Sequence, residues 1–122
     1  MQDTLTVKTV TKVIGLERVD STQNIAKELA LAGEPEGTMV LACMQTAGRG
    51  RYERAFASGE GGVYFTLILR PQKPAACNAS LSVRVGEAVA KTLTELFDLK
   101  TKIKEPNDVL VWDNQARKWK KI

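Results

Sequence analysis

Residues 38–44 form a nearly continuous apolar run that has the length of a β-strand. A run this short and this apolar is typical of a strand covered on both faces. A second such run, at residues 63–69, follows a glycine pair and ends at Arg70-Pro71. Alternate residues of that run would point to opposite faces of a sheet. Any fold for this chain must therefore be built around a sheet that contains these two runs.

Two segments have the spacing of amphipathic helices. Residues 22–32 follow Asp20 and Ser21, either of which can cap a helix start, and Gly33 favours the helix end. Residues 79–97 place six apolar residues at helical spacing, namely Leu81, Val85, Ala88, Val89, Leu93 and Leu96. Gly86 inside this segment costs about 1 kcal/mol relative to alanine, which suggests close packing against a neighbouring element.

Strands are also expected at residues 13–19, 99–104, 109–112 and 118–122, with a turn at residues 113–116. The strands and the two helices predict an α+β fold, a mixed β-sheet with helices packed on it. The length of 122 residues favours a single domain over residues 1–122.

The composition excludes several kinds of site. The chain has no histidine, which rules out Ser-His-Asp and Cys-His nucleophile pairs and histidine-bearing zinc sites. Cys43 and Cys77 could form one disulfide, but the chain shows no secretory signal, so we expect reduced thiols and a cytoplasmic location. No apolar run reaches the ~18–20 residues that a membrane-spanning helix needs.

The positive charge is concentrated near one end. The formal net charge is +4, and residues 100–122 carry all of it, with seven basic and three acidic side chains. This excess fits a solvated charged face, or an anionic ligand or partner at that end.

Three segments carry residue types suited to chemistry. The loop at residues 45–54 combines two glycines with three arginines, which bind phosphate or carboxylate oxygens in pairs. Residues 104–108 offer an amide and a carboxylate that could hold a metal ion. Residues 20–22 lie at a helix start. Taken one at a time, the loop fits a solvated hairpin tip as well as a binding loop, whereas residues 104–108 and 20–22 fit a plain turn and an ordinary helix cap better than a site.

In this order the segments resemble the biotin protein ligase family. The resemblance covers nearly all of residues 14–122, and its most specific pair is Gln-Thr-Ala-Gly-Arg-Gly-Arg at residues 45–51 with Pro-Asn-Asp-Val at residues 106–109. Further matches are Asp20-Ser21-Thr22 with Asn24, Gly37-Thr38, Ser58, residues 61–65, residues 69–71, residues 102–104 and Lys121-Ile122. Lipoate ligases and octanoyltransferases share the fold but usually lack that pair.

The resemblance implies a catalytic domain similar to class II aminoacyl-tRNA synthetases, of which this chain would be the truncated N-terminal part. A helix-turn-helix before it and a small β-barrel after it, which some members have, are not expected. Members join biotin to ATP with Mg²⁺ to give biotinyl-5′-AMP, and then transfer biotin to a lysine of a biotin carboxyl carrier protein. Two alternatives stay open, a non-catalytic remnant that binds biotin or nucleotide, and a lipoate ligase-like relative.

The resemblance also implies roles for individual residues. Biotin would be bound by Ser21, Thr22, Gln45, Gly48, Arg49, Arg51 and Lys121. The nucleotide would be bound by Gly50, Arg51, Arg54, Phe56, Asn107 and Asp108, with Asp108 also holding Mg²⁺. The catalytic groups would be Arg49, Arg51, Lys104 and Lys121. We expect these cations to converge on a single pocket.

Three positions depart from the family pattern. Glu53 stands where the family usually has glycine, Glu105 where it has tryptophan, and Phe56 where tryptophan is common.

The sequence also bears on two kinds of partner. Nucleic acid is disfavoured as a partner, because the arginine loop and the lysine strand do not form one continuous basic run. An exposed sheet edge at the end of the chain suggests a homodimer.

Overall fold

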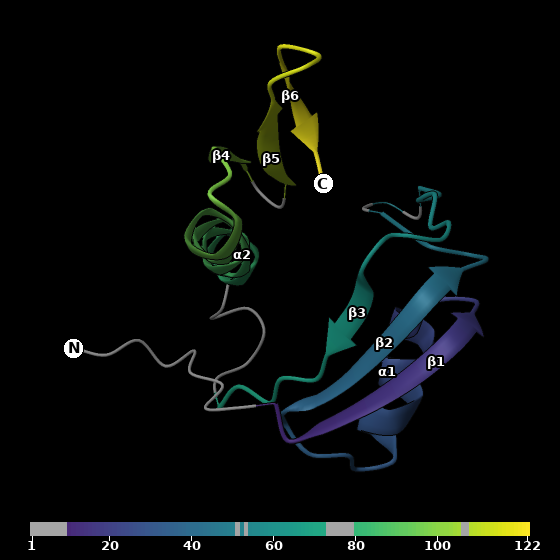
Figure 1. The fold of residues 1–122 in the computed structure, drawn as a ribbon. Coiled ribbons are helices and arrows are strands. Elements are labelled where there is room, and N and C mark those ends of the chain that lie inside the picture. Colours follow the sequence, from purple (N-terminus) through teal and green to yellow (C-terminus); the bar gives the residue numbers. More distant parts are fainter. Residues whose placement is uncertain (1–9, 51, 53, 73–79, 106–107) are drawn as a thin grey trace. The chain divides into compact units, whose positions relative to one another are not determined.

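The computed structural model describes residues 10–50, 52, 54–72, 80–105 and 108–122. The chain divides into two compact units, Met1–Gln72 and Lys73–Ile122. Figure 1 shows their elements, and each unit is described by itself. The expectation of a single domain over residues 1–122 stays a prediction.

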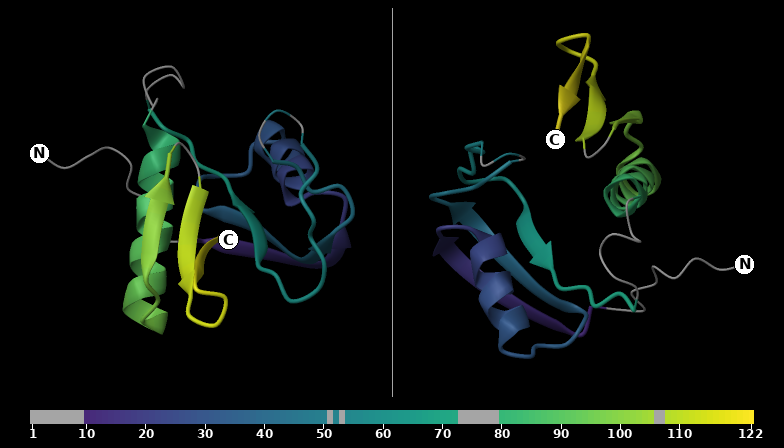
Figure 2. Two further views of the ribbon diagram at one scale, coloured as in Figure 1. Left: turned by 90° about the horizontal axis from the view of Figure 1, so that it is seen from above. Right: turned by 180° about the vertical axis from the view of Figure 1, so that it is seen from behind.

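The first unit is a three-stranded mixed sheet with one helix. It contains β1 (Lys12–Val19), α1 (Thr22–Leu31), β2 (Thr38–Gln45) and β3 (Tyr64–Leu67). The sheet order is β1-β2-β3, with β1 and β2 parallel and β2 and β3 antiparallel. Two parallel neighbours need a crossover connection, and α1 supplies it. Figure 2 shows α1 against one face of this sheet, and the α+β prediction with a mixed sheet is confirmed.

The helix of this unit begins and ends where the sequence predicts. Ser21 is the N-cap, and its Oγ accepts a hydrogen bond from the amide of Gln23. Gly33 follows the helix with a φ of +97°, a conformation in which a side chain is strained. These two local signals set the two ends of the helix.

The core of this unit lies between α1 and the sheet. It is formed by Ala26, Val40 and Ile68, with Leu16, Ile25, Leu29 and Ala30 packed against them. The expectation that residues 38–44 are covered on both faces is wrong, because Thr38, Val40 and Ala42 are buried whereas Cys43 is exposed. Within this unit, α1 covers only one face of the sheet.

The third strand is shorter than the apolar run that predicts it. It spans Tyr64–Leu67, and Val63 before it is 76% exposed, whereas Ile68 after it is 6% exposed. The face that bears Ile68 packs on the helix, and the face that bears Phe65 does not. The side chains of residues 63–69 therefore alternate between the two faces of the sheet, as predicted. The alternation does not reveal which of the two faces is buried.

The second unit is an antiparallel sheet with one helix. It contains α2 (Leu81–Phe97), β4 (Thr101–Lys104), β5 (Asp108–Asp113) and β6 (Lys118–Lys121), in the sheet order β4-β5-β6. Lys102 and Lys104 are exposed along β4 while Ile103 between them is half-buried, as the period-two pattern predicts. The turn after β5 is closed by Asp113, whose Oδ1 accepts from the amides of Gln115 and Ala116.

The packed face of α2 is only partly the predicted one, because Leu81, Val89 and Leu93 are half-buried but the other three predicted residues are exposed. Gly86 and Ala90 are its buried residues, whereas Val85 and Leu96 are 44% and 69% exposed. Ala88 is exposed as well. Gly86 faces Ile103 of β4 and Val109 of β5, but a Cβ built on it would meet them at ordinary van der Waals distances, so the packing does not require the glycine that the sequence suggested it would.

Two expectations from composition can be compared with the described residues. None of their helices is long and apolar enough to cross a membrane. Cys43 is a free, exposed thiol, while Cys77 lies outside the residues that the structure describes.

Candidate functional site

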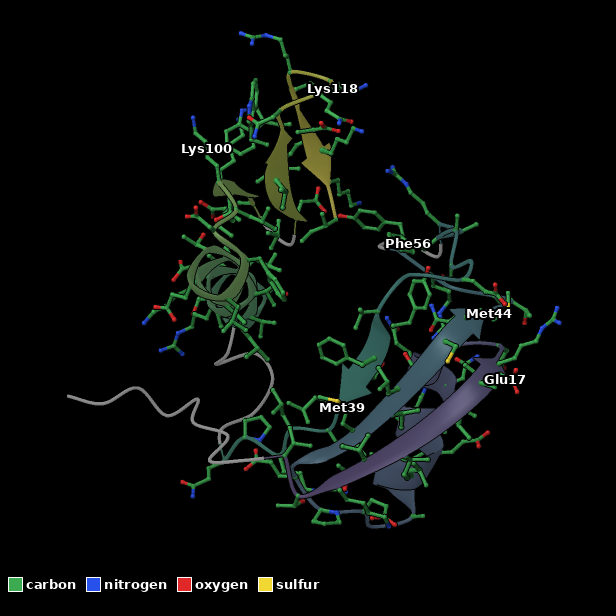
Figure 3. All side chains as sticks on the ribbon, in the orientation of Figure 1. Glu17, Met39, Met44, Phe56, Lys100 and Lys118 are labelled. Carbon is green, nitrogen blue, oxygen red and sulfur yellow. The ribbon has the colours of Figure 1, made fainter. Side chains whose placement is uncertain are left out.

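Two strand ends and a helix start meet at one edge of the first sheet. Because β1 and β2 are parallel, their carboxyl ends lie at the same edge, where Val19 pairs with Gln45. The amides of Thr46 and Ala47 donate to the carbonyls of Val19 and Asp20 at 2.9 and 2.8 Å. Figure 3 labels Met44 at this end of β2 and Met39 at the other. The loop after β2 is therefore fastened beside the start of α1.

Gln45 is the centre of a buried hydrogen-bond network. Its Oε1 accepts from the backbone amide of Thr22 at 2.8 Å and lies 3.2 Å from the Thr22 hydroxyl. That hydroxyl also lies 2.9 Å from the hydroxyl of Thr66. Thr22 is 3% exposed. The side chain of Gln45 thus joins β2, α1 and β3 at one point.

The other end of the Gln45 carboxamide faces Ser58. Gln45 Nε2 donates to Ser58 Oγ at 3.0 Å, and Ser58 Oγ donates to the carbonyl of Phe56 at 3.0 Å. The Gln45 amide also donates to the Ser58 carbonyl at 3.0 Å. Ser58 is 5% exposed. These bonds fix the orientation of the carboxamide and bring the far end of the loop back onto β2.

Gly48 allows the loop to pack this closely. A Cβ built on Gly48 would lie 2.6 Å from the Phe56 carbonyl oxygen and 2.9 Å from Gln45 Nε2, and closer still to Ser58 Oγ. The Phe56 amide donates to the Gly48 carbonyl at 2.8 Å. Only a residue without a side chain fits between the two arms of the loop.

Arg49 leaves the loop toward the first turn of α1. Its NH1 group donates to Asn24 Oδ1 at 2.6 Å, and Asn24 Nδ2 donates to Asp20 Oδ2 at 3.1 Å. The hydrogen bond from Asn24 lowers the pKa of Asp20, and the Ser21 amide and the nearby Arg49 charge act in the same direction. Arg49 is half-buried, and its hydrogen bond to Asn24 ties the guanidinium to the first turn of α1.

The remaining loop residues are more exposed. The Gly50 amide donates to the Arg54 carbonyl at 2.6 Å, and an isolated bridge pairs Arg49 with Ala55. Arg54 is exposed, and Phe56 is 40% exposed. Arg51, a predicted site residue, and Glu53, which departs from the family pattern, lie outside the described residues.

The second unit brings together three of its predicted residues. Lys104 and Asp108 are Cα partners across β4 and β5. Lys121 Nζ on β6 lies 3.3 Å from Asp108 Oδ1. Lys104 and Glu105 are exposed, and Asn107 lies outside the described residues. The idea that these cations and the arginine loop converge on one pocket stays a prediction.

Asp108 is the residue predicted to hold a metal ion. Among the described residues, no three histidine, cysteine or acidic side chains lie close enough together to hold one. Asp108 offers a single half-buried carboxylate beside the Lys121 ammonium. One carboxylate fits Mg²⁺ that is bound mainly through water and phosphate oxygens, which is how this ion usually meets a nucleotide.

The first unit combines a neutral polar centre with a cation. The Gln45 carboxamide can offer its second Nε2 hydrogen to a ligand carbonyl, and Arg49 offers guanidinium donors to an anionic group. Ser21 and Thr22 are 1% and 3% exposed, so they support the helix start and Gln45 rather than face solvent. The arrangement suits a ligand with a neutral polar head and a negatively charged tail.

Comparison with known proteins places the chain in a family. A model of the biotin/lipoate A/B protein ligase family matches residues 15–122. The chain belongs to that family. It is 46% identical over 94 residues to the bifunctional ligase/repressor BirA of Bacillus subtilis. It is also 40% identical over 98 residues to the biotin–[acetyl-CoA-carboxylase] ligase of Paracoccus denitrificans.

Solved structures of ligases resemble this family member in fold as well. The biotin protein ligase of Aquifex aeolicus, in complex with biotin and ATP, matches with a TM-score of 0.70 at 36% identity, over 81% of this chain and 41% of that one. The enzyme of Leishmania major, with biotinyl-5-AMP, matches with a TM-score of 0.71 at 27% identity, over 89% and 49%.

The ligase-family chain spans only part of these relatives. The matched residues make up 76% of this chain and 29% of the Bacillus subtilis protein, and 79% and 40% for the Paracoccus denitrificans protein. The expected correspondence to a part of the ligase is therefore confirmed, and the activity of the whole enzyme is treated below as a proposal.

Three residues of this site were given no specific role from the sequence, although Asn24 and Ser58 are among the residues that match the family pattern. Asn24 contacts Arg49, Ser58 contacts Gln45, and Thr66 contacts Thr22. Asn24 stands four residues after Asp20 at a helix start, and Thr66 alternates with Ile68, so each position carried a local signal. The contacts themselves depend on tertiary structure, which those signals do not specify.

Proposed function

We propose that this chain carries the biotin- and ATP-binding part of a biotin protein ligase and acts in the formation of biotinyl-5′-AMP. The observation that carries the proposal is that two side chains of the loop are tied to the start of α1: the Gln45 carboxamide, which also binds Ser58, is bonded to Thr22, and the Arg49 guanidinium is bonded to Asn24. Support comes from the family match over residues 15–122 and from the relatives whose structures hold biotin and ATP.

Biotin has the two parts that this arrangement suits. Its ureido ring is neutral and offers a carbonyl and two N–H groups, which a fixed carboxamide such as that of Gln45 can match. Its carboxylate would lie toward Arg49 and the Gly48 and Gly50 backbone. Arg51 and Lys121 are assigned to the same carboxylate by resemblance. A pre-oriented carboxamide keeps the cost of binding low, because less side-chain freedom is lost.

The chemical step requires two anions to meet. The biotin carboxylate must attack the α-phosphorus of ATP, and pyrophosphate leaves as the new acyl–phosphate bond forms. Fixed positive charge reduces the repulsion and stabilises the charge that develops on phosphorus, which is the role we assign to Arg49, Arg51 and Lys104. An ionised carboxylate needs no general base, so the absence of histidine is compatible with this step.

The remaining nucleotide contacts are assigned by resemblance. Phe56, Arg54 and Asn107 would contact the nucleotide, and Asp108 would hold Mg²⁺ through its carboxylate. When bound, Mg²⁺ would neutralise charge on the phosphate oxygens. In the second half-reaction the biotinyl group would pass to a lysine of a biotin carboxyl carrier protein.

A second candidate is a binding protein that does not turn over. Its support is Glu105, an exposed carboxylate that stands where the family usually has tryptophan and would repel an anionic nucleotide. Such a chain would bind biotin or ATP without joining them.

Biotin-dependent exchange of labelled pyrophosphate into ATP separates the two candidates. Only a protein that forms biotinyl-5′-AMP reversibly returns the label to ATP. We expect exchange that requires both biotin and Mg²⁺ and does not require lipoate. The exchange should be lost in Gln45→Ala. Biotin binding without exchange would establish the non-catalytic alternative, and exchange driven by lipoate rather than biotin would establish a lipoate ligase-like relative.

A further inference from the structure

We propose that the face of the second sheet that points away from α2 is a docking surface for an acidic protein segment. Its centre is a cluster of two tryptophans and two lysines, Trp112, Trp119, Lys100 and Lys102, which we call the Trp–Lys face. The proposal does not depend on the proposed function, because none of these four residues is assigned to biotin or nucleotide.

Strand register gathers the cluster on one face of the sheet. Trp112 of β5 pairs with Trp119 of β6, and the Trp112 amide donates to the carbonyl of Lys100, just before β4, at 3.0 Å. Residues opposite each other on neighbouring strands share a face, and the face alternates along each strand. Ile103 and Val109 pair on the other face, which packs on α2. The Trp–Lys face is therefore not the face that the helix covers.

The two lysines lie over the aromatic rings. Lys102 Nζ is 4.4 Å from the ring centroid of Trp119, and Lys100 Nζ is 5.9 Å from the centroids of both tryptophans. The rings meet edge to face with 5.5 Å between their centroids, and both tryptophans are half-buried. A tryptophan ring attracts a cation within about 6 Å of its centroid. The rings thus hold the two ammonium groups in place without neutralising them.

The ammonium groups of the Trp–Lys face are not used in ion pairs. Both lysines are exposed, and within the part of the chain that the structure describes neither lies in a salt bridge. The lysines of β6 differ, because Lys120 pairs with Asp113 and Lys121 pairs with Asp108. The carboxylates of β5 are therefore occupied by β6, and the positive charge of the Trp–Lys face is left for a partner.

Fixed ammonium groups beside aromatic rings suit a partner that carries carboxylates. Each ammonium can donate a charge-assisted hydrogen bond to a carboxylate, and side chains that are already oriented lose little freedom on binding. The rings add apolar surface for the methylene groups of acidic side chains. A protein segment with neighbouring acidic residues offers both kinds of contact.

Single-stranded nucleic acid fits this surface less well. Proteins that bind it usually stack bases on open aromatic faces. Here both rings are half-buried and have lysines over them. We therefore assign the surface to an acidic protein segment, and nucleic acid is tested as the competing outcome.

Tryptophan fluorescence of the full chain tests the proposal directly. The sequence has two tryptophans, and both belong to the Trp–Lys face. Titration with a ten-residue glutamate peptide should give a saturable change, and a ten-residue glutamine peptide should give none. Raising the salt concentration from about 50 to about 300 mM should weaken the binding about tenfold, because salt screens exposed charges. No saturable change with the glutamate peptide, or an equal change with the glutamine peptide, would overturn the proposal.

A matched pair of double variants locates the binding. Lys100→Gln with Lys102→Gln should weaken binding of the glutamate peptide about tenfold, because both placed charges are lost. Arg117→Gln with Lys118→Gln removes the same charge from the exposed turn before β6 and should change the affinity less than about twofold. Equal losses in the two double variants would show that only net charge matters, and would refute the proposal.

Circular dichroism checks that both double variants are folded. If the first one is not, Lys102→Gln alone should still weaken binding about threefold relative to Lys118→Gln, and equal affinities of these two single variants would refute the proposal.

The same titration with a ten-nucleotide oligothymidylate separates the two classes of partner. We expect weaker binding than that of the glutamate peptide at the same salt concentration. Equal or tighter binding of the oligonucleotide would overturn the assignment to an acidic protein segment.

Discussion

Gly48 and Ser58 approach each other so closely that no side chain fits between them. A Cβ on Gly48 would collide with Ser58 Oγ and would lie 2.6 Å from the backbone oxygen of Phe56. The backbone cannot retreat easily, because the Phe56 amide is bonded to the Gly48 carbonyl at 2.8 Å. This contact seats the arginine loop on the Gln45 network.

Gly48→Ala should therefore destabilise the protein by roughly 1–3 kcal/mol, the usual cost of forcing extra atoms into a packed site. Chemical denaturation measures the loss. Gly50→Ala is the control in the same loop, since its Cβ would meet the Arg54 carbonyl at an ordinary 3.7 Å. A Gly48→Ala protein as stable as Gly50→Ala would contradict the packing described here.

Gly86→Ala should have the opposite effect. Gly86 lies inside α2, and a Cβ there would be 3.6 Å from Ile103 Cδ1 and 3.7 Å from Val109 Cγ2, which is normal van der Waals contact. Alanine favours a helix by about 1 kcal/mol relative to glycine. We expect an increase of about that size in the free energy of unfolding. A decrease would show that α2 lies closer to β4 and β5 than described.

Thr38→Val should stabilise the first unit. Thr38 is fully buried, and its Oγ1 has no hydrogen-bond partner among the described residues. An unpaired buried hydroxyl costs about 1–3 kcal/mol, and valine has nearly the same shape. We expect a gain of about 1 kcal/mol in the free energy of unfolding. Thr66→Val, which removes a hydroxyl bonded to Thr22, should instead lower it.

Asp113 should titrate at unusually low pH. The ion pair with Lys120 at 2.6 Å and the amides of Ala116 and Gln115 lower its pKa from 3.8 to about 2. The contact therefore stabilises the folded turn fully above pH 3.8, and this contribution is lost as pH falls through about 2. Carboxyl ¹³C NMR measures the titration directly. In Lys120→Ala the midpoint should rise toward 3.8, and an unchanged midpoint would exclude Lys120 as the main cause.

Local signals in the sequence were sufficient for most of the secondary structure. Ser21 and Gly33 mark the two ends of α1, and the alternation around Ile103 marks β4. Such features depend on residues close together in the chain. The choice of the buried face of α2 does not, because it depends on how closely β4 and β5 approach Gly86, which periodicity of large apolar residues cannot report.

In the site too, some features follow from residues that are close in the sequence and others depend on tertiary structure. The loop from Gln45 to Arg49 is recognisable as a pattern, because its glycines and arginines are adjacent in the sequence. Ser58 and Thr66 are single polar residues whose contacts with Gln45 and Thr22 arise from the loop path and the strand register. Ser58 matches the family pattern, but the sequence alone assigns a contact neither to Ser58 nor to Thr66.

The dissociation constant for biotinyl-5′-AMP, measured for wild type and Arg49→Ala, tests most directly whether the Arg49 guanidinium binds the activated ligand. Loss of a charge-assisted hydrogen bond should cost about 1.5–3 kcal/mol, which is roughly 10- to 150-fold in affinity. Arg18→Ala removes an exposed arginine from β1 and serves as the charge-matched control. The account predicts a loss of that size for Arg49→Ala alone. An Arg49→Ala protein that binds biotinyl-5′-AMP as tightly as wild type would contradict it.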